Sequence, residues 1–351
     1  MVRNGVLLMG PAGSGKSTLC HHLQQQYEVS RHRVACVNLD PAAEYMPYEP
    51  LVDIRELITA DDAAEELQLG PNGSLVFCIE YLEQHKEWLE EKLLELCEDD
   101  LLLFDLPGQI ELFVHLDSFR FIFNYLEKQG FRFCVAYCLD VNFFTDAAKS
   151  ISGSLLALNA MLFFELPHVN ILTKCDLVSK LNITTRESSS KRGPRRSHRP
   201  RGAAAAAAAA AANDREEEED SEEEESDESD EDEADTAGAQ WAGRCIDTSA
   251  FAVRVDDAGP DETEEDIVVE QLLSKDVQQI VEELDDNMPA NFRDLHRAFA
   301  SVLEEFGLVS FYPLNISNEN SIINLGTLLR STVQADEDDE PRADYDYQAE
   351  A

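Results

Sequence analysis

The sequence has no long apolar run and no paired cysteine motif, and it has far fewer basic residues than acidic ones. Its eight cysteines show no CxxC spacing, and several lie in apolar runs, which favours buried thiols in a reducing compartment. The spacing of Cys134 and Cys138 would allow a metal site, but their position in a strand-like apolar run is better explained by packing in the core. No run reaches membrane-spanning length, and the apolar amino-terminal stretch is too short for a secretion signal. We therefore expect a soluble, cytoplasmic protein.

The acidic excess is concentrated rather than spread along the chain. The formal net charge is −43, from 28 Lys and Arg against 71 Asp and Glu. Of these acidic residues, 17 fall between Asp214 and Asp235, 7 between Asp256 and Asp266, and 8 between Asp336 and Glu350. Such charge blocks are typical of solvated tails. Their sign argues against nucleic acid or an anionic membrane as a direct partner.

Low-complexity sequence divides the chain. A basic stretch, ten consecutive alanines and an acidic serine-bearing tract follow one another and provide no core. We interpret this insertion as a solvated linker; an import signal in its basic run, kinase sites at its serines and a gene-model artefact are the alternatives. The predicted parts are residues 1–186, the first part of a P-loop core; 187–265, a disordered insertion; 266–333, the carboxyl-terminal helices and last strand of the core; and 334–351, an acidic tail.

Apolar strands alternate with helix-length segments. Strands are predicted at 5–10, 32–40, 100–109, 131–140, 168–176 and 308–315. Between the second and third, the pattern predicts a helix at 55–66, a turn at Gly70–Gly73 and an amphipathic segment over 75–97. Alternation of this kind predicts an α/β fold, a three-layer P-loop NTPase with a mostly or wholly parallel sheet. Ligands bind such sheets beyond the carboxyl ends of the strands, where Asp40, Asp105 and Thr173 fall.

A phosphate-binding signature follows the first strand. "GPAGSGKST" at 10–18 satisfies G-x-x-x-x-G-K-[ST] between a strand and a helix. Its backbone amides and the helix amino terminus face phosphate, Lys16 reaches the β and γ phosphates, and Ser17 ligates Mg²⁺. The predicted phosphate-binding residues are Gly13, Ser14, Gly15, Lys16, Ser17 and Thr18. A glycine-rich turn with a chance lysine is the alternative.

A second motif, "LLLFDLPGQIE", places Asp105 at a strand end, where it can hold the Mg²⁺ hydration shell. Gln109 and Glu111 are candidates for positioning the attacking water, because phosphoryl transfer depends on orientation and charge stabilisation. A plain strand-to-helix turn is the alternative. Asp40, at the end of the second strand, is a candidate for the metal shell or for activating water, and equally for capping a helix.

The segment "ILTKCD" indicates which base is bound. In Thr173, Lys174, Cys175 and Asp176 the lysine stem can lie on a purine face. The aspartate can accept two N–H groups from the Watson–Crick edge of guanine, whereas adenine presents an acceptor there. The motif is weak alone and persuasive as the third nucleotide motif in order.

Together these motifs, with "NLDPAAE" and the tripeptide Gly70-Pro71-Asn72, resemble those of the GPN-loop GTPases. The resemblance covers residues 1 to about 185 and 265–333, and further stretches such as "DIRELI" look most like the third eukaryotic paralogue of that family. The family's last guanine-contacting segment is matched only loosely by "FYPLN" at 311–315, so its residues are not assigned.

The resemblance implies properties that the motifs alone do not give. It implies GTP as substrate, Mg²⁺ as cofactor and a dimer in which Gly70, Pro71 and Asn72 reach the partner's nucleotide, with Asn72 stabilising phosphate there. It implies a heterodimer with GPN-loop GTPase 1, or a homodimer, that assists the assembly and nuclear import of RNA polymerase II by contacting its subunits. A cytoplasmic protein that shuttles to the nucleus fits this role.

Two other functions are weighed against a hydrolysing switch. One is a nucleotide-stabilised binding subunit whose paralogue partner carries most of the hydrolysis. The other is a small-molecule kinase, against which the T-K-C-D motif and the lack of an arginine-rich lid after the fourth strand both argue.

Overall fold

The computed structural model describes residues 3–30, 32–96, 101–114, 116–180, 264–275, 277–305 and 309–334. The predicted insertion at 187–265 and acidic tail at 334–351 therefore lie outside the described residues, apart from Glu264, Glu265 and Gln334. Helix α9 begins at Glu264, so helical structure starts two residues before the predicted boundary.

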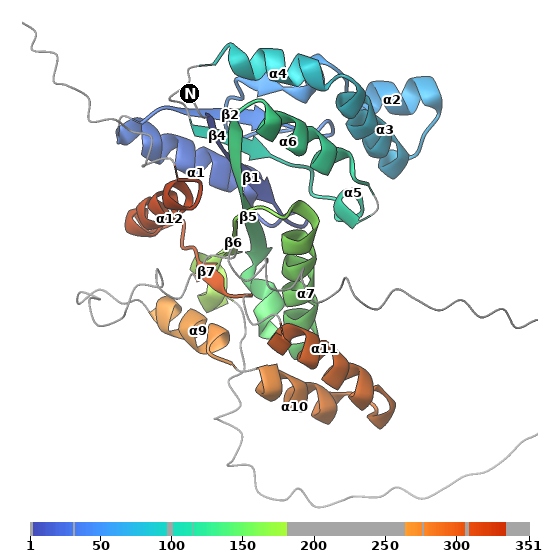
Figure 1. Ribbon diagram of the computed structural model, residues 1–351. Helices are drawn as coiled ribbons and strands as arrows, with labels where there is room; N and C mark the ends of the chain where they lie inside the picture. Colours follow the sequence, from blue (N-terminus) through green and yellow to red (C-terminus); the bar gives the residue numbers. More distant parts are fainter. Residues whose placement is uncertain are drawn as a thin grey trace, which may run out of the picture. The chain divides into compact units, whose positions relative to one another are not determined.

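Seven strands form one sheet within the described residues (Figure 1). They are β1 (Arg3–Met9), β2 (Val34–Asn38), β3 (Val52–Asp53), β4 (Leu101–Asp105), β5 (Phe131–Asp140), β6 (His168–Thr173) and β7 (Phe311–Pro313). Their order is β3-β2-β4-β1-β5-β6-β7, and every pair is parallel. The predicted parallel sheet is confirmed. The two-residue β3 was missed, because its sequence continues directly into a helical turn.

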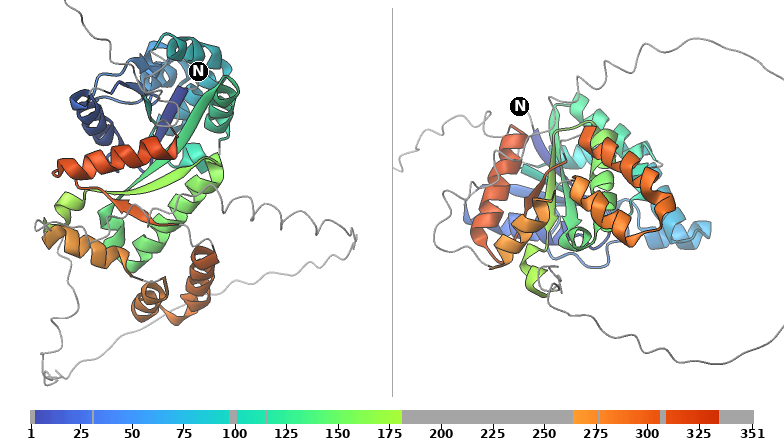
Figure 2. Two further views of the ribbon diagram at one scale, coloured as in Figure 1. Left: turned by 60° about the vertical axis from the view of Figure 1, so that its left-hand side comes forward. Right: turned by 90° about the horizontal axis from the view of Figure 1, so that it is seen from below.

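Helices cover both faces of this sheet, as the two views of Figure 2 show. The longer ones are α1 (Lys16–Val29), α2 (Ala60–Leu67), α3 (Pro71–Gln84), α4 (Lys86–Leu94), α6 (Ser118–Lys128), α7 (Ala147–Phe164), α9 (Glu264–Leu273), α10 (Val277–Asn287), α11 (Arg293–Glu305) and α12 (Glu319–Thr332). Helices α1 and α12 pack on one face, and α3, α4, α6 and α7 on the other. The three-layer arrangement is therefore confirmed.

The alternation of side chains along β5 explains this division. Phe133 and Val135 face the α3–α6–α7 layer, whereas Cys134, Ala136 and Cys138 face α1 and α12. Cys134 and Cys138 are fully buried in the core, as the packing interpretation predicts. Within the described part of the chain, no group of three His, Cys, Asp or Glu side chains is arranged to hold a metal ion.

Helix α7 is long and apolar enough to cross a membrane by length and composition alone, contrary to the expectation that no run reaches that length. Core helices meet the same criteria. Its Ala157, Ala160 and Phe164 belong to the core beneath the sheet, and α10 and α11 pack against it.

The turn predicted at Gly70–Gly73 is wrong, because these residues form the beginning of α3. Gly70 is the N-cap and Pro71 the first helical residue, a position that tolerates proline because its missing N–H would have no helical partner. The amphipathic segment predicted over 75–97 is in turn divided at His85 into α3 and α4.

Candidate functional site

The phosphate-binding loop joins β1 to α1 at the carboxyl end of the sheet. Gly10, Gly13 and Gly15 have φ values of 142°, 75° and 95°, which other residues rarely adopt. A Cβ on Gly10 would lie 2.2 Å from the Cys138 carbonyl oxygen. The loop therefore requires glycine both for its curvature and for its close approach to β5. Ser14, between two of these glycines, is buried.

Lys16 lies across this loop from the first turn of α1. Its Nζ donates to the carbonyl oxygens of Gly10 at 3.0 Å and Pro11 at 3.2 Å, and the side chain is buried. Burial lowers the lysine pKa, while the negative charges of Asp105 and Asp40 oppose that shift. The ammonium is held where an incoming phosphate can take over its hydrogen bonds. Ser17 and Thr18 follow in the same helical turn.

Asp105 and Ser17, the two residues predicted to hold Mg²⁺, lie close together. Asp105 is 3% exposed, and its Oδ2 accepts a hydrogen bond from the Tyr48 hydroxyl at 2.9 Å. Its Oδ1 is buried and has no hydrogen-bond partner among the described residues. Burial raises the Asp105 pKa, although Ser17, Tyr48 and the Lys16 charge act to lower it. An unpartnered buried carboxylate oxygen beside a serine fits a hydrated Mg²⁺, which prefers oxygen ligands.

Asp40 lies near these residues but caps no helix. Its Oδ1 accepts from the Ala42 N–H at 3.0 Å and closes a turn, while α2 is capped by Thr59. The helix-capping alternative is therefore wrong. Burial raises the Asp40 pKa, and the Ala42 N–H and Lys16 oppose the shift. Asp40 is therefore still placed where it could contact the Mg²⁺ hydration shell or a water near the phosphates.

The segment after β4 rests on the phosphate loop. A Cβ on Gly108 would lie 2.7 Å from the Ala12 Cα, so glycine is required for this approach. Gln109 follows, and its Nε2 donates to the Asn72 Oδ1 at 3.3 Å. Glu111 is exposed at the beginning of a four-residue helix, α5 (Glu111–Val114). Gln109 thus directly follows the glycine that approaches the phosphate loop, whereas Glu111 is exposed and forms no hydrogen bond with the described residues of that loop.

The T-K-C-D motif lies at the end of β6 and contacts the phosphate loop. Thr173 Oγ1 donates to the Ser14 carbonyl oxygen at 2.7 Å. Lys174 has a left-handed φ of 61°, and its Nζ forms a 2.7 Å ion pair with Asp140. Cys175 is buried, and its Sγ donates to the Leu172 carbonyl oxygen. Asp176 keeps a buried Oδ1 without a hydrogen-bond partner among the described residues, which leaves it available to a base.

The unassigned "FYPLN" segment lies beside this motif. Strand β7 pairs with β6, and the Leu314 N–H donates to the Leu172 carbonyl oxygen at 2.8 Å. The Cys175 N–H in turn donates to the Leu314 carbonyl oxygen at 3.3 Å. Residues 311–315 therefore support the predicted guanine site from its outer side.

The tripeptide Gly70-Pro71-Asn72 is exposed at the rim of this edge. Exposed leucines precede it, Leu67 at 46% and Leu69 at 37%. The tripeptide thus combines a polar amide with a neighbouring apolar surface.

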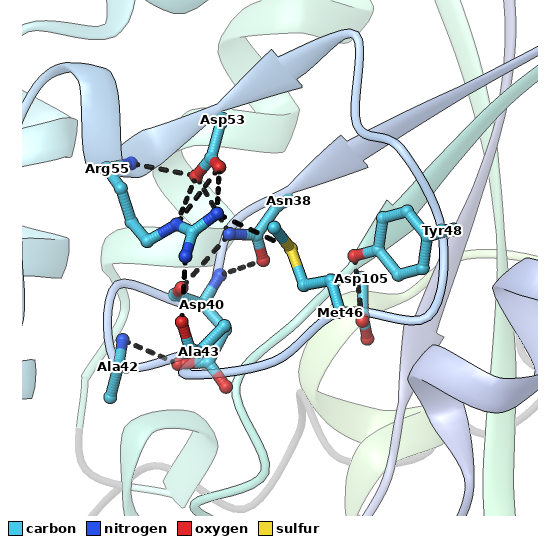
Figure 3. A network of polar contacts seen from close by, with 9 residues as sticks. All are labelled: Asn38, Asp40, Ala42, Ala43, Met46, Tyr48, Asp53, Arg55 and Asp105. Atoms are coloured by element: carbon cyan, nitrogen blue, oxygen red, sulfur yellow. Dashed lines mark hydrogen bonds and ion pairs between the residues drawn. The ribbon is translucent and has the colours of Figure 1, made fainter.

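Sequence reasoning missed a polar network on the loop between β2 and β3, residues 39–51 (Figure 3). Arg55 forms a 2.6 Å ion pair with Asp53 and donates to the Ala43 carbonyl oxygen at 2.9 Å. Asn38 donates to Asp53 at 2.9 Å and accepts from the Asp40 N–H at 3.0 Å. The Arg55–Asp53 and Asn38–Asp40 contacts are local, whereas Arg55 reaches Ala43 and Asn38 reaches Asp53 across 12 and 15 positions, and spacing gives no signal for those two.

Comparisons with known proteins agree with this geometry. A family model described as "Conserved hypothetical ATP binding protein" matches residues 8–200. GPN-loop GTPase 3 of Eremothecium gossypii is 32% identical over 99% of this chain and 97% of its own length. GPN-loop GTPase 3 of Aspergillus fumigatus is 50% identical over 51% of this chain and 62% of that protein. A GTPase from Pyrococcus abyssi, solved in its apo form, has the same fold at a TM-score of 0.57 and 19% identity, covering 93% of this chain and 96% of that one.

Proposed function

The chain belongs to the GPN-loop GTPase family, and on that premise we propose that it is a Mg²⁺-dependent GTP-hydrolysing switch that works as a dimer. The observation that carries this proposal is the meeting of the phosphate loop, Asp105 and Asp176 at one edge of the sheet. The family-model description mentions ATP, but the T-K-C-D motif and the names of the relatives favour guanine.

Different residues bind the phosphates, hold Mg²⁺, orient the attacking water and select the base. The loop amides and the α1 amino terminus bind the phosphates, and Lys16 moves from its own loop carbonyls to the β and γ phosphate oxygens. Ser17 and Asp105 would hold Mg²⁺, which supplies charge stabilisation to the phosphates. Gln109 orients the attacking water, with Asp40 as the second candidate for that role. Asp176 selects guanine.

A partner subunit completes the site in this proposal. Gly70, Pro71 and Asn72 are exposed, and an uncharged amide at Asn72 can approach a second subunit's phosphates without repulsion. The exposed Leu67 and Leu69 supply apolar surface for the contact. We propose a heterodimer with GPN-loop GTPase 1, with a homodimer as the alternative.

The proposed cellular role is assembly and nuclear import of RNA polymerase II, through contact with its subunits. Family membership supports it. A protein in this role resides in the cytoplasm and shuttles to the nucleus. Capture with the tagged protein in GDP and GTP-analogue states, followed by mass identification, tests the role: polymerase subunits should be recovered in a nucleotide-dependent way.

Nucleotide binding to the purified protein, with and without its paralogue partner, tests the activity. We expect GTP binding, rejection of ATP, and hydrolysis that requires Mg²⁺ and the dimer. Equal binding of ATP and GTP, or of neither, would contradict the proposal.

The second candidate is a nucleotide-stabilised binding subunit with hydrolysis in the partner. The exposure of Glu111 and the contact of Gln109 with Asn72 favour it, because within the described residues neither side chain forms a hydrogen bond with the phosphate loop. Gln109→Ala in this subunit alone discriminates: a switch loses its own turnover, whereas a binding subunit leaves the turnover of the dimer unchanged.

A further inference from the structure

Tyr48 is buried near the end of a loop that is only partly buried. It is 4% exposed, whereas Tyr45, three residues earlier on the same loop, is 83% exposed. Its ring packs in the core layer under α1, beside Cys20 and Cys36. Burying a phenol hydroxyl is unfavourable unless the hydroxyl is hydrogen-bonded. The partner of Tyr48 is therefore informative.

That partner is Asp105, whose Oδ2 lies 2.9 Å from the Tyr48 hydroxyl. An ionised carboxylate has only acceptors, so the tyrosine donates. Burial and the neighbouring Asp105 charge raise the Tyr48 pKa, which keeps the proton on the phenol. One carboxylate oxygen is thus engaged, and the other, Oδ1, remains without a partner among the described residues.

The loop that delivers Tyr48 is fixed at three points (Figure 3). Asn38 holds the backbone of Asp40 at its beginning, through contacts of 3.0 and 3.2 Å. Arg55, anchored on Asp53, holds the Ala43 carbonyl oxygen in its middle. Tyr48 holds its end against Asp105. The loop therefore has a defined position relative to the carboxylate.

We propose that Tyr48 is a positioning residue for the Mg²⁺ of bound nucleotide: its hydroxyl fixes the Asp105 carboxylate so that Oδ1 alone faces the metal's hydration shell. This role rests on the proposed Mg²⁺-dependent GTPase function. The terminal torsion of an aspartate is broad and roughly two-fold, so burial alone does not choose which oxygen points to the metal. The hydrogen bond makes that choice before the metal arrives.

The test uses Tyr48→Phe, which removes only the hydroxyl, in the full-length protein. Wild type and variant are loaded with fluorescent GDP, and the release rate is measured as free Mg²⁺ is titrated from EDTA conditions upward. We expect the Mg²⁺ concentration for half-maximal retention to rise by about tenfold, the size of a lost hydrogen bond to a charged group. The release rate in EDTA should change little, and the melting temperature should fall by no more than the loss of one buried hydrogen bond implies. Tyr45→Phe, at the exposed tyrosine of the same loop, is the matched control and should match wild type.

A second measurement separates positioning from packing. In an Asp105→Ala background, which removes the acceptor, Tyr48→Phe should no longer shift the Mg²⁺ midpoint, because the two residues act through one hydrogen bond. Additive shifts, or equal acceleration of release with and without Mg²⁺, would overturn the role of Tyr48. An unchanged midpoint in Tyr48→Phe would also overturn it while leaving the GTPase proposal intact. A wild-type GDP release rate that does not depend on Mg²⁺ would contradict the metal site and, with it, the proposed role of Tyr48.

Discussion

The side-chain amide of Gln109 donates a hydrogen bond to the side-chain Oδ1 of Asn72 in the same chain, at 3.3 Å. The contact joins the segment after β4 to the first turn of α3, two regions that the sequence separates by 37 positions. The candidate water-positioning residue and the family tripeptide thus lie at one rim of the sheet. A change at Asn72 can therefore act on its own subunit through Gln109, or on a partner, and these two effects must be measured separately.

The substitution Asn72→Asp distinguishes an effect on its own subunit from an effect on the partner. An aspartate can still accept from Gln109, but it adds a negative charge where an approaching phosphate would be repelled. In mixed dimers with the variant in one subunit, hydrolysis in the opposite site should fall by about 100-fold, as for removal of one transition-state donor. Nucleotide affinity of the variant's own site should stay within about twofold, since no ground-state contact is lost there. Single-turnover rates in each site measure both effects.

The matched control for this change is Asn124→Asp, an exposed asparagine on α6. It adds the same charge away from the nucleotide edge and should leave both sites active. Loss confined to the site of the Asn72→Asp subunit would refute action across the dimer.

Gly108→Ala should weaken nucleotide binding. The added methyl would lie 2.7 Å from the Ala12 Cα and 3.0 Å from its nitrogen, and this backbone cannot move without distorting the phosphate loop. Overpacking of this kind costs about 1–3 kcal/mol, so GTP affinity measured by calorimetry should fall about tenfold or more.

Gly73→Ala is the control for Gly108→Ala. Gly73 lies in helix α3, and a Cβ at this position would lie 3.6 Å from the Leu69 side chain, an ordinary van der Waals contact. Removing a helical glycine should stabilise the protein by about 0.5–1 kcal/mol and leave GTP affinity unchanged. Equal affinity losses in the two variants would contradict the steric explanation.

The sequence predicted those parts of the site that follow from local order, and missed those that depend on long-range contacts. The phosphate loop, Asp105 and the T-K-C-D motif each follow a strongly apolar strand, so their common edge follows from a parallel sheet. Tyr48 and Arg55 carry no such signal, because an isolated tyrosine or arginine in a polar stretch is usually exposed. The start of α3 was misread because glycine, proline and asparagine favour turns and helix amino termini alike.

Asp176→Asn should change which base is bound. The Asp176 Oδ1 is buried without a partner among the described residues, as expected for an acceptor that awaits the N–H groups of guanine. An asparagine would turn its own N–H group toward one of those donors. GTP affinity should fall by about 10-fold or more, the scale of one lost hydrogen bond to a charged group.

Xanthosine triphosphate provides the rescue in this experiment. Xanthine carries a carbonyl oxygen where guanine carries its exocyclic amine, and can accept from the asparagine. Competition binding should therefore show a gain for xanthosine triphosphate in Asp176→Asn and none in Asp117→Asn, an exposed control. Unchanged GTP affinity in Asp176→Asn would contradict the assignment of the base site.

The last prediction concerns His168, which is buried on β6 with its ring stacked on Tyr137. Both ring nitrogens lack a hydrogen-bond partner among the described residues. Burial lowers the pKa of His168 to about 3, although Asn170 acts to raise it. The unfolded chain, with a histidine pKa of about 6.5, therefore binds a proton between pH 6.5 and 3 that the folded chain does not. Stability must fall as the pH is lowered through that window.

His168→Phe keeps an apolar ring and removes the titration. From pH 7 to pH 5 the free energy of unfolding of the wild type should fall by about 2 kcal/mol more than that of the variant, from the unfolded-state pKa. Urea unfolding at the two pH values measures this difference. His85→Phe, at an exposed histidine, is the matched control and should keep the wild-type pH dependence. The same pH dependence in wild type and His168→Phe would show that His168 is protonated as readily in the folded chain as in the unfolded one.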